Sequence, residues 1–242
     1  MRITEVAPGV HAVESDAVNW TLVEDGEALT LIDAGYPGDH DNVIASIRQI
    51  GHQPSDLQAV LITHAHVDHI GSLPQLLAEH PVPVLTSERE AAHVRREHLE
   101  QATPLDVTKN LWRPGAVRWS MKLMRLGAMK DVSVPSATAF EPPLDLPGRP
   151  VPVDTAGHTT GHTAYLLPDA RVLVTGDALV NGHPLLRRTG PQRLPGFFDH
   201  DPANVERAHD AIAAVDADVI VPGHGPVYRG SPAEAVAELR SA

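Results

Sequence analysis

Thr63-His64-Ala65-His66-Val67-Asp68-His69 decides the fold, because this stretch places three imidazoles and a carboxylate within a few positions of one another. It directly follows the apolar run Ala59-Val60-Leu61-Ile62. Such a run followed by a dense polar cluster indicates a buried strand that carries metal ligands in the loop at its end. On a strand, His64 and His66 would share one face, and Asp68 and His69 would follow in the turn. Imidazole and carboxylate ligands together suit a borderline first-row cation such as zinc.

Three further candidate ligands each follow an apolar run where a strand is expected to end. These are His158 after residues 151–157, Asp177 after residues 171–176, and His224 after residues 218–223. Functional side chains gather at one end of buried strands because the loops there vary without disturbing the core. The four motifs, taken in order, closely resemble those of the metallo-β-lactamase superfamily, from about residue 10 to residue 227.

This resemblance implies an α/β fold, a four-layer αβ/βα sandwich in which two αβ halves pack sheet to sheet. It also implies two divalent metal ions, zinc in the first place, with iron or manganese as alternatives. One ion would be bound by His64, His66 and His158, and the other by Asp68, His69 and His224, with Asp177 bridging the two. His162, four residues after His158, is interpreted as a supporting or structural residue. Asp33 matches an early aspartate of the family that holds a ligand imidazole in one tautomer.

Composition limits the classes of partner and the compartment. We expect a single metallo-β-lactamase-fold domain over residues 1–242, since 42% of the residues are hydrophobic and no composition break suggests a linker. The formal net charge of −12 disfavours general nucleic-acid binding. The absence of cysteine excludes disulfides and thiolate ligands. The first residues do not resemble a signal peptide, and no apolar run is long enough for stable membrane insertion, which predicts a cytoplasmic protein.

Hydrophobic periodicity predicts alternating strands and helices, as an α/β fold requires. Strands are expected at residues 10–13, 20–23 and 29–32, with Asp25-Gly26 as a hairpin turn. Helices are expected at residues 41–50, 72–79, 87–100 and 201–215, and from Ser231-Pro232 onward. For the helix that starts at Ser87, the serine is the expected cap, with Glu90 three residues later.

Residues 104–150 form an insert with its own chemistry, rich in proline and carrying basic residues within an acidic chain. A helix is expected from Pro114 to Leu126, with Gly127 at its exit. Its apolar arc, which includes Trp119, is about twice as wide as one packing surface needs. A second apolar contact is therefore implied, and it could be a substrate under a lid, a homodimer partner through the 112–126 helix, or a membrane surface. We expect the insert to cover the active site, so that Trp119 walls the cleft.

Departures from subfamily patterns narrow the reaction. β-Lactamases with these motifs generally lack the bridging aspartate that Asp177 would provide, and lactonases carry a tyrosine where Val180 stands here. Hydroxyacylglutathione hydrolases add a C-terminal helical domain, for which the residues after His224 leave no room. The resemblance then implies a hydrolase in which a metal-bridging hydroxide cleaves an ester, thioester, lactone or phosphodiester of a small molecule, while Asp68 relays the proton. The alternatives are a mononuclear-iron oxidoreductase similar to sulfur dioxygenases and a metal-dependent binding protein.

Overall fold

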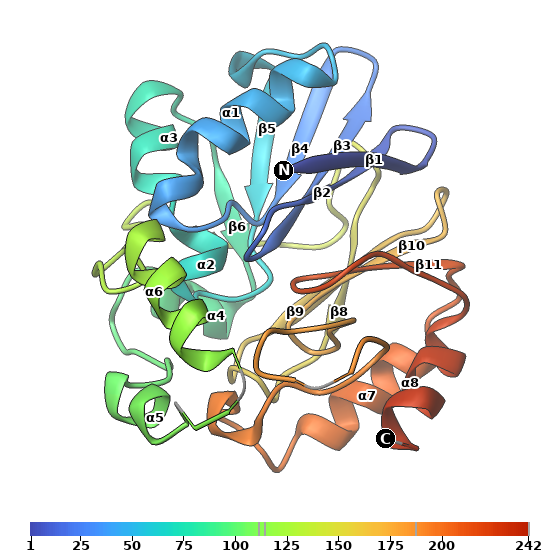
Figure 1. Cartoon of the computed structure of the whole chain (residues 1–242). Coiled ribbons are helices and arrows are strands. Elements are labelled where there is room, and N and C mark those ends of the chain that lie inside the picture. The colour runs from blue at the N-terminus through green and yellow to red at the C-terminus, as the bar shows by residue number, and fades with distance from the viewer. Residues whose placement is uncertain (111, 114, 187, 242) are drawn as a thin grey trace.

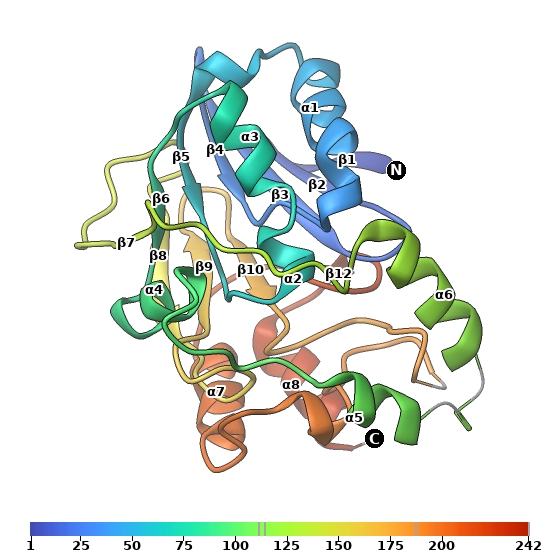
Figure 2. The same ribbon diagram turned by 90° about the vertical axis from the view of Figure 1, so that its left-hand side faces the viewer.

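The computed structural model describes residues 1–110, 112–113, 115–186 and 188–241, and it contains two β-sheets flanked by helices (Figures 1 and 2). The first sheet has the order β1-β2-β3-β4-β5-β6-β7 and the second the order β12-β11-β10-β9-β8. The strands of the first sheet are β1 (Arg2–Ala7), β2 (Val10–Glu14), β3 (Asn19–Asp25), β4 (Ala28–Ile32), β5 (Leu57–Leu61), β6 (Val84–Thr86) and β7 (Thr138–Ala139). Those of the second are β8 (Val151–Asp154), β9 (Thr163–Leu167), β10 (Val172–Gly176), β11 (Val219–Pro222) and β12 (Tyr228–Arg229).

The helices lie on the outer faces of the two sheets. Helices α1 and α3 cover the first sheet, and α7 and α8 cover the second (Figures 1 and 2). The α-helices are α1 (His40–Gln49), α2 (Val67–Ile70), α3 (Leu73–Glu79), α4 (Glu88–Val94), α5 (Pro104–Lys109), α6 (Ala116–Leu126), α7 (Val205–Ala213) and α8 (Pro232–Arg240). Short 3-10 turns lie at Pro37–Asp39, Pro54–Asp56 and Gly196–Phe198.

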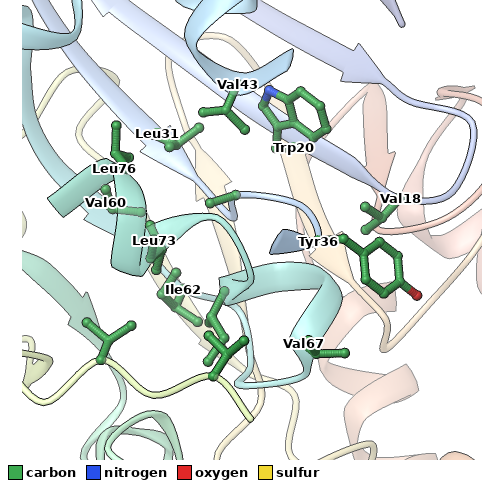
Figure 3. Close-up of a cluster of buried hydrophobic side chains, with 14 of the residues drawn as sticks. Val18, Trp20, Leu31, Tyr36, Val43, Val60, Ile62, Val67, Leu73 and Leu76 are labelled. Atoms are coloured by element: carbon green, nitrogen blue, oxygen red, sulfur yellow. The ribbon is translucent and has the colours of Figure 1, made fainter. Parts of the chain in front are cut away.

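Three clusters of buried apolar side chains fill the three spaces between these four layers. Between the first sheet and its helices lie Trp20, Leu31, Val43, Leu73 and Leu76 (Figure 3). Between the two sheets lie Val10, Tyr165, Val172, Val174, Val219 and Val221. Between the second sheet and its helices lie Leu173, Ile212, Ile220 and Val236. Alternate residues of β10 and β11 thus face opposite layers, as the period of two in a strand requires. The four-layer α/β sandwich expected from the sequence is confirmed.

The expected strands and the Asp25-Gly26 hairpin are present, because β3 pairs antiparallel with β4 around this turn. Several boundaries differ from expectation. Helix α4 ends at Val94 rather than at residue 100, because Arg96 adopts a left-handed backbone with φ of 63°. Helix α7 begins at Val205 rather than near residue 201, where the chain makes a turn that bonds Asp201 N–H to the Gly157 carbonyl.

The insert is only partly separate from the sheet. Its residues 138–139 form β7, which pairs with β6 at the edge of the first sheet. The expected helix is confirmed as α6, but its expected first residue, Pro114, lies outside the described residues. Within the part of the chain that the structure describes, no helix has both the length and the apolar character needed to cross a membrane.

Candidate metal centre

The seven candidate ligands lie together at one edge of the sandwich, where strands of both sheets end. Strands β4 and β5 run parallel and lead into Asp33 and the loop that starts at Ile62. Strands β10 and β11 run parallel and lead into Asp177 and His224. His158 follows β8. The expected strand-end placement is thus what the structure shows, with one correction. Strand β5 ends at Leu61, so His64 and His66 lie in a loop, and Asp68 and His69 lie in the short helix α2 rather than in a turn.

A first group of side chains that could hold a metal consists of His64, His66, His158 and Asp177, all buried. His66 Nδ1 lies 3.1 Å from His64 Nε2 and 3.0 Å from His158 Nε2. Asp177 Oδ2 lies 3.5 Å from His158 Nε2. Three imidazole nitrogens and one carboxylate oxygen therefore converge on one point, which is a donor set suited to a divalent first-row cation.

A second group consists of Asp68, His69 and His224. His224 Nε2 lies 3.4 Å from Asp68 Oδ2. The same nitrogen lies 3.3 Å from Asp177 Oδ2, and His69 Nε2 lies 3.4 Å from Asp177 Oδ1. Asp177 therefore stands between the two groups, as a bridging ligand would. The backbone at Gly223 allows this approach, since a Cβ there would collide with Asp177 Oδ1.

In the part of the chain that the structure describes, several buried atoms of the candidate ligands, His158 Nδ1 among them, lack the hydrogen-bond partners that buried polar atoms ordinarily have. Among the described residues, His69 Nε2 and Asp177 Oδ1 have no hydrogen-bond partner. Buried polar atoms are normally satisfied, so unsatisfied ones that point at each other across 3.4 Å fit a site for a cation. The residues present thus fit two metal ions.

Electrostatics also favour cations here. Burial, followed by the nearby imidazoles, lowers the pKa of His64 and His66 well below the usual histidine value, which keeps their nitrogen lone pairs available. Burial by itself also lowers the pKa of His224, but the carboxylates of Asp177 and Asp68 raise it to about 10. These two carboxylates therefore stabilise positive charge at the second group.

Hydrogen bonds fix the far nitrogens of several imidazoles. Asp33 Oδ2 accepts from His69 Nδ1 at 2.8 Å, which is the contact expected of this aspartate. The Ala17 carbonyl accepts from His224 Nδ1 at 2.8 Å. His162 Nε2 accepts from the Asp177 backbone N–H at 3.2 Å and its Nδ1 bonds Thr155 Oγ1 at 2.8 Å. Both nitrogens of His162 are thus engaged, which supports its interpretation as a structural residue.

Two further side chains reach the centre and were not identified from the sequence. The Tyr36 hydroxyl lies 3.3 Å from Asp68 Oδ2, and the His183 ring lies 5.1 Å from that of His224. Tyr36 follows Asp33 closely, so its place just after a strand end was the available signal. His183 carries no such signal, because its position depends on the irregular segment after Asp177.

A cavity of about 530 Å³ opens beside the second group. Its lining includes Arg2, Glu14, Asp16, Asn19, His183 and His224. The lining carries charges of both signs and also apolar side chains such as Met1 and Pro184, so the space beside His224 suits a small molecule with polar and apolar parts. Burial and the neighbouring His224 lower the pKa of His183 to about 3, so the His183 side chain in the cavity wall is uncharged at neutral pH.

Comparisons with known proteins agree with this geometry. The family model described as "Metallo-beta-lactamase superfamily" matches residues 14–224. The probable metallo-hydrolase YflN of Bacillus subtilis (strain 168) is 26% identical over 231 residues, which cover 91% of this chain and 85% of that protein. A hydroxyacylglutathione hydrolase of Alkalilimnicola ehrlichii is 33% identical over 168 residues, which cover 69% of this chain and 49% of that protein. A metallo-beta-lactamase of Cronobacter sakazakii with a HARLDQ motif has a similar fold, with a TM-score of 0.71 at 18% identity over 100% of this chain and 92% of that chain.

Proposed function

Because the chain belongs to the metallo-β-lactamase superfamily, we propose that this metal-dependent hydrolase works with two cations, zinc in the first place. His64, His66 and His158 would hold one ion, and Asp68, His69 and His224 the other. Asp177 would bridge them, and its position carries the proposal, because its two carboxylate oxygens face His158 and His69 from between the two groups.

The bound cations supply Lewis acidity, which lowers the pKa of water and polarises the oxygen of the scissile bond. The protein contributes orientation and a proton acceptor. Burial by itself raises the pKa of Asp68, but the imidazoles of His69 and His224 outweigh burial and place this pKa below the usual value. Asp68 is therefore ionised at neutral pH and can accept a proton and pass it to the leaving group. The Tyr36 hydroxyl donates to Asp68 and keeps the carboxylate in place.

The substrate class follows from the bond chemistry and from the cavity. Lewis-acid activation by two cations suits the hydrolysis of an ester, thioester, lactone or phosphodiester. A cavity of about 530 Å³ beside His224, lined by both polar and apolar side chains, suits a small molecule. The partial likeness to a hydroxyacylglutathione hydrolase supports the inclusion of thioesters among the substrates to be tested.

Metal content and substrate screening test this proposal together. Elemental analysis of untagged protein after supplementation should give two zinc equivalents per chain, and the zinc-loaded protein should cleave at least one member of a panel of esters, thioesters, lactones and phosphodiesters. A single iron per chain would instead support an oxidoreductase. Two metals without cleavage of any compound would support a binding protein.

We also propose that the 104–150 insert covers the active site through Trp119. The Trp119 ring lies 5.3 Å from that of His183, which itself stands beside His224. Trp119→Ala should therefore change the ratio of kcat/KM between substrates while both metals stay bound. Leu123→Ala is the matched control, because Leu123 is equally buried on the same face of α6. If both variants keep the substrate preference of the wild type, the helix only fills space.

The outer face of α6 supports a homodimer. Val117, Met121 and Met124 are exposed there, opposite the buried side of the helix. Arg118 and Arg125 lie on the same exposed surface of a chain with a formal charge of −12, so a second copy offers both apolar contact and complementary charge. Sedimentation should show a dimer that Met121→Glu disrupts. A monomer at all concentrations would contradict this proposal.

A further inference from the structure

A fully buried carboxylate on α4 joins the two loops that carry the three histidines of the first group. Glu90 Oε1 accepts a hydrogen bond from the Ala65 N–H at 2.7 Å, and Ala65 stands between His64 and His66. Glu90 Oε2 accepts from the Thr159 hydroxyl at 2.8 Å, and Thr159 directly follows His158. One side chain therefore holds both loops, although neither loop belongs to its own helix.

Glu90 is also connected to His66 through His93 and the backbone of Glu100. The Glu100 backbone N–H can only donate, so His93 Nε2 must be the acceptor of their hydrogen bond at 3.1 Å. The proton of His93 therefore lies on Nδ1, which donates to Glu90 Oε1 at 2.8 Å. The Glu100 carbonyl must accept, so His66 Nε2 donates to it at 2.7 Å. The carbonyl thus leaves the lone pair of His66 on Nδ1, the nitrogen that faces His64 and His158, and the bond from the Glu100 N–H to His93 holds this carbonyl in place.

The His93, His98 and Glu100 side chains lie close enough together to suggest another cation site. Their hydrogen bonds argue against this interpretation. Both ring nitrogens of His93 are engaged, and the Glu100 carboxylate accepts from the backbone N–H and the hydroxyl of Thr160, each at 2.7 Å. This cluster therefore serves the proposed centre: it ties the segment that bonds His66 to the loop that carries His158.

Glu90 was expected to complete the cap of its helix, but its carboxylate turns inward instead. Ser87 Oγ accepts from the Glu90 N–H at 3.2 Å, which is one half of a capping box. The other half would need the carboxylate at the Ser87 backbone, whereas the carboxylate bonds Ala65, His93 and Thr159. Burial of a charged group is costly unless it is hydrogen-bonded, and here three donors satisfy it.

We propose that Glu90 is a positioning residue that pre-organises His66 and His158 for the first metal ion. The inference rests on the proposed two-metal function. The second group is held by other contacts, namely Asp33 on His69 and the Ala17 carbonyl on His224. Within the described residues, no hydrogen bond joins Glu90 to Asp68, His69 or His224. Loss of Glu90 should therefore weaken one metal site and spare the other.

Stepwise metal titration of the full chain tests this selectivity, with Co²⁺ absorption and Zn²⁺ competition against a chromophoric chelator as readouts. Glu90→Ala should weaken one of the two binding steps by about 10–100-fold, the usual effect of losing a supporting contact, and change its Co²⁺ spectrum. Glu90→Gln should restore both, because its amide oxygen can accept from Ala65 and His93 while the Thr159 hydroxyl turns to accept from the amide nitrogen.

Glu24→Ala is the matched control. Glu24 also accepts from two imidazoles, those of His11 and His52, and neither belongs to the proposed centre. This variant should reduce the stability of the fold and leave both binding steps unchanged.

Equal weakening of both steps by Glu90→Ala, or the same weakening by Glu24→Ala, would overturn the proposal and make Glu90 a general stability residue. If Glu90→Ala does not fold, Thr159→Val decides, because it removes only the donor to Oε2; unchanged binding steps would then refute the positioning role. Failure of the proposed function is recognised separately, since the wild-type chain itself would then bind fewer than two cations.

Discussion

Replacement of Asp33 by asparagine should separate the role of this residue in metal binding from its role in folding. Asp33 is 2% exposed and has a φ of 61°, a left-handed backbone that asparagine tolerates well, so Asp33→Asn leaves the backbone unstrained. The carboxylate accepts from the Thr63 N–H at 2.9 Å, the Thr63 hydroxyl at 2.7 Å and His69 Nδ1 at 2.8 Å. An amide offers only one oxygen for these partners. In either amide orientation, an N–H donor then faces another N–H donor.

Two costs follow from this mismatch. An unsatisfied buried donor lowers the free energy of unfolding by about 1–3 kcal/mol. If His69 instead moves its proton to Nε2, it loses the lone pair that faces Asp177, and the affinity of the second site should fall by about 10–100-fold. At saturating zinc, that loss of affinity removes a further ~1.4–2.7 kcal/mol of apparent stability. The deficit of the variant should therefore be larger with zinc than with a chelator.

Urea unfolding followed by circular dichroism, with zinc and with chelator, measures both costs. Asp39→Asn is the control, because Asp39 is equally buried but accepts from the Tyr36 N–H and the Asn42 amide rather than from an imidazole. Its deficit should be the same in both conditions. Equal deficits with and without zinc for Asp33→Asn, together with wild-type zinc affinity, would refute the reasoning.

Three other changes give direct outcomes. Asp177→Ala should lower the occupancy of both metals more than His162→Ala does, because only the former side chain faces both groups; elemental analysis that shows equal losses would reverse the assignment. Chelator should lower the melting temperature of the wild type, and a melting curve that does not respond to zinc would contradict this. The imidazoles of His11 and His52 lower the pKa of Glu24. Its stabilising effect is thus present above its unfolded pKa and is lost as the pH falls through the folded value, so Glu24→Gln should flatten the acid limb of stability against pH. An unchanged acid limb would show that these contacts contribute nothing.

The sequence predicted which segments bring the proposed ligands together, because most of these segments follow the end of a strand. Their role as metal ligands stays a prediction. Strand ends made His64, His158, Asp177 and His224 candidates, and the resemblance to the metallo-β-lactamase superfamily then implied their division between two ions. The inward turn of Glu90 could not be predicted, since its partners Ala65 and Thr159 lie 25 and 69 residues away. The local sequence pattern predicts a capping hydrogen bond for the Glu90 carboxylate, but this carboxylate forms tertiary hydrogen bonds instead.

Other differences also reflect long-range packing. Strand β7 has only two residues, both exposed, and pairs with β6 across more than fifty residues, so hydrophobic pattern gives no signal for it. His183 reaches the centre through an irregular segment that has no period. Helix α4 ended early because Arg96 adopts a left-handed conformation, which is uncommon for a residue other than glycine.

The division of the proposed ligands between the two sheets has a consequence for protein synthesis. His64, His66, Asp68 and His69 leave the ribosome early, whereas His158 and Asp177 follow about a hundred residues later and His224 follows them. Each proposed site takes ligands from both the early and the late part of the chain. The nascent chain therefore has neither site while only the first sheet has emerged. The second site must wait until His224 has cleared the exit tunnel. Completion of both sites would then report the docking of the two sheets, because contacts so distant in sequence form late in folding.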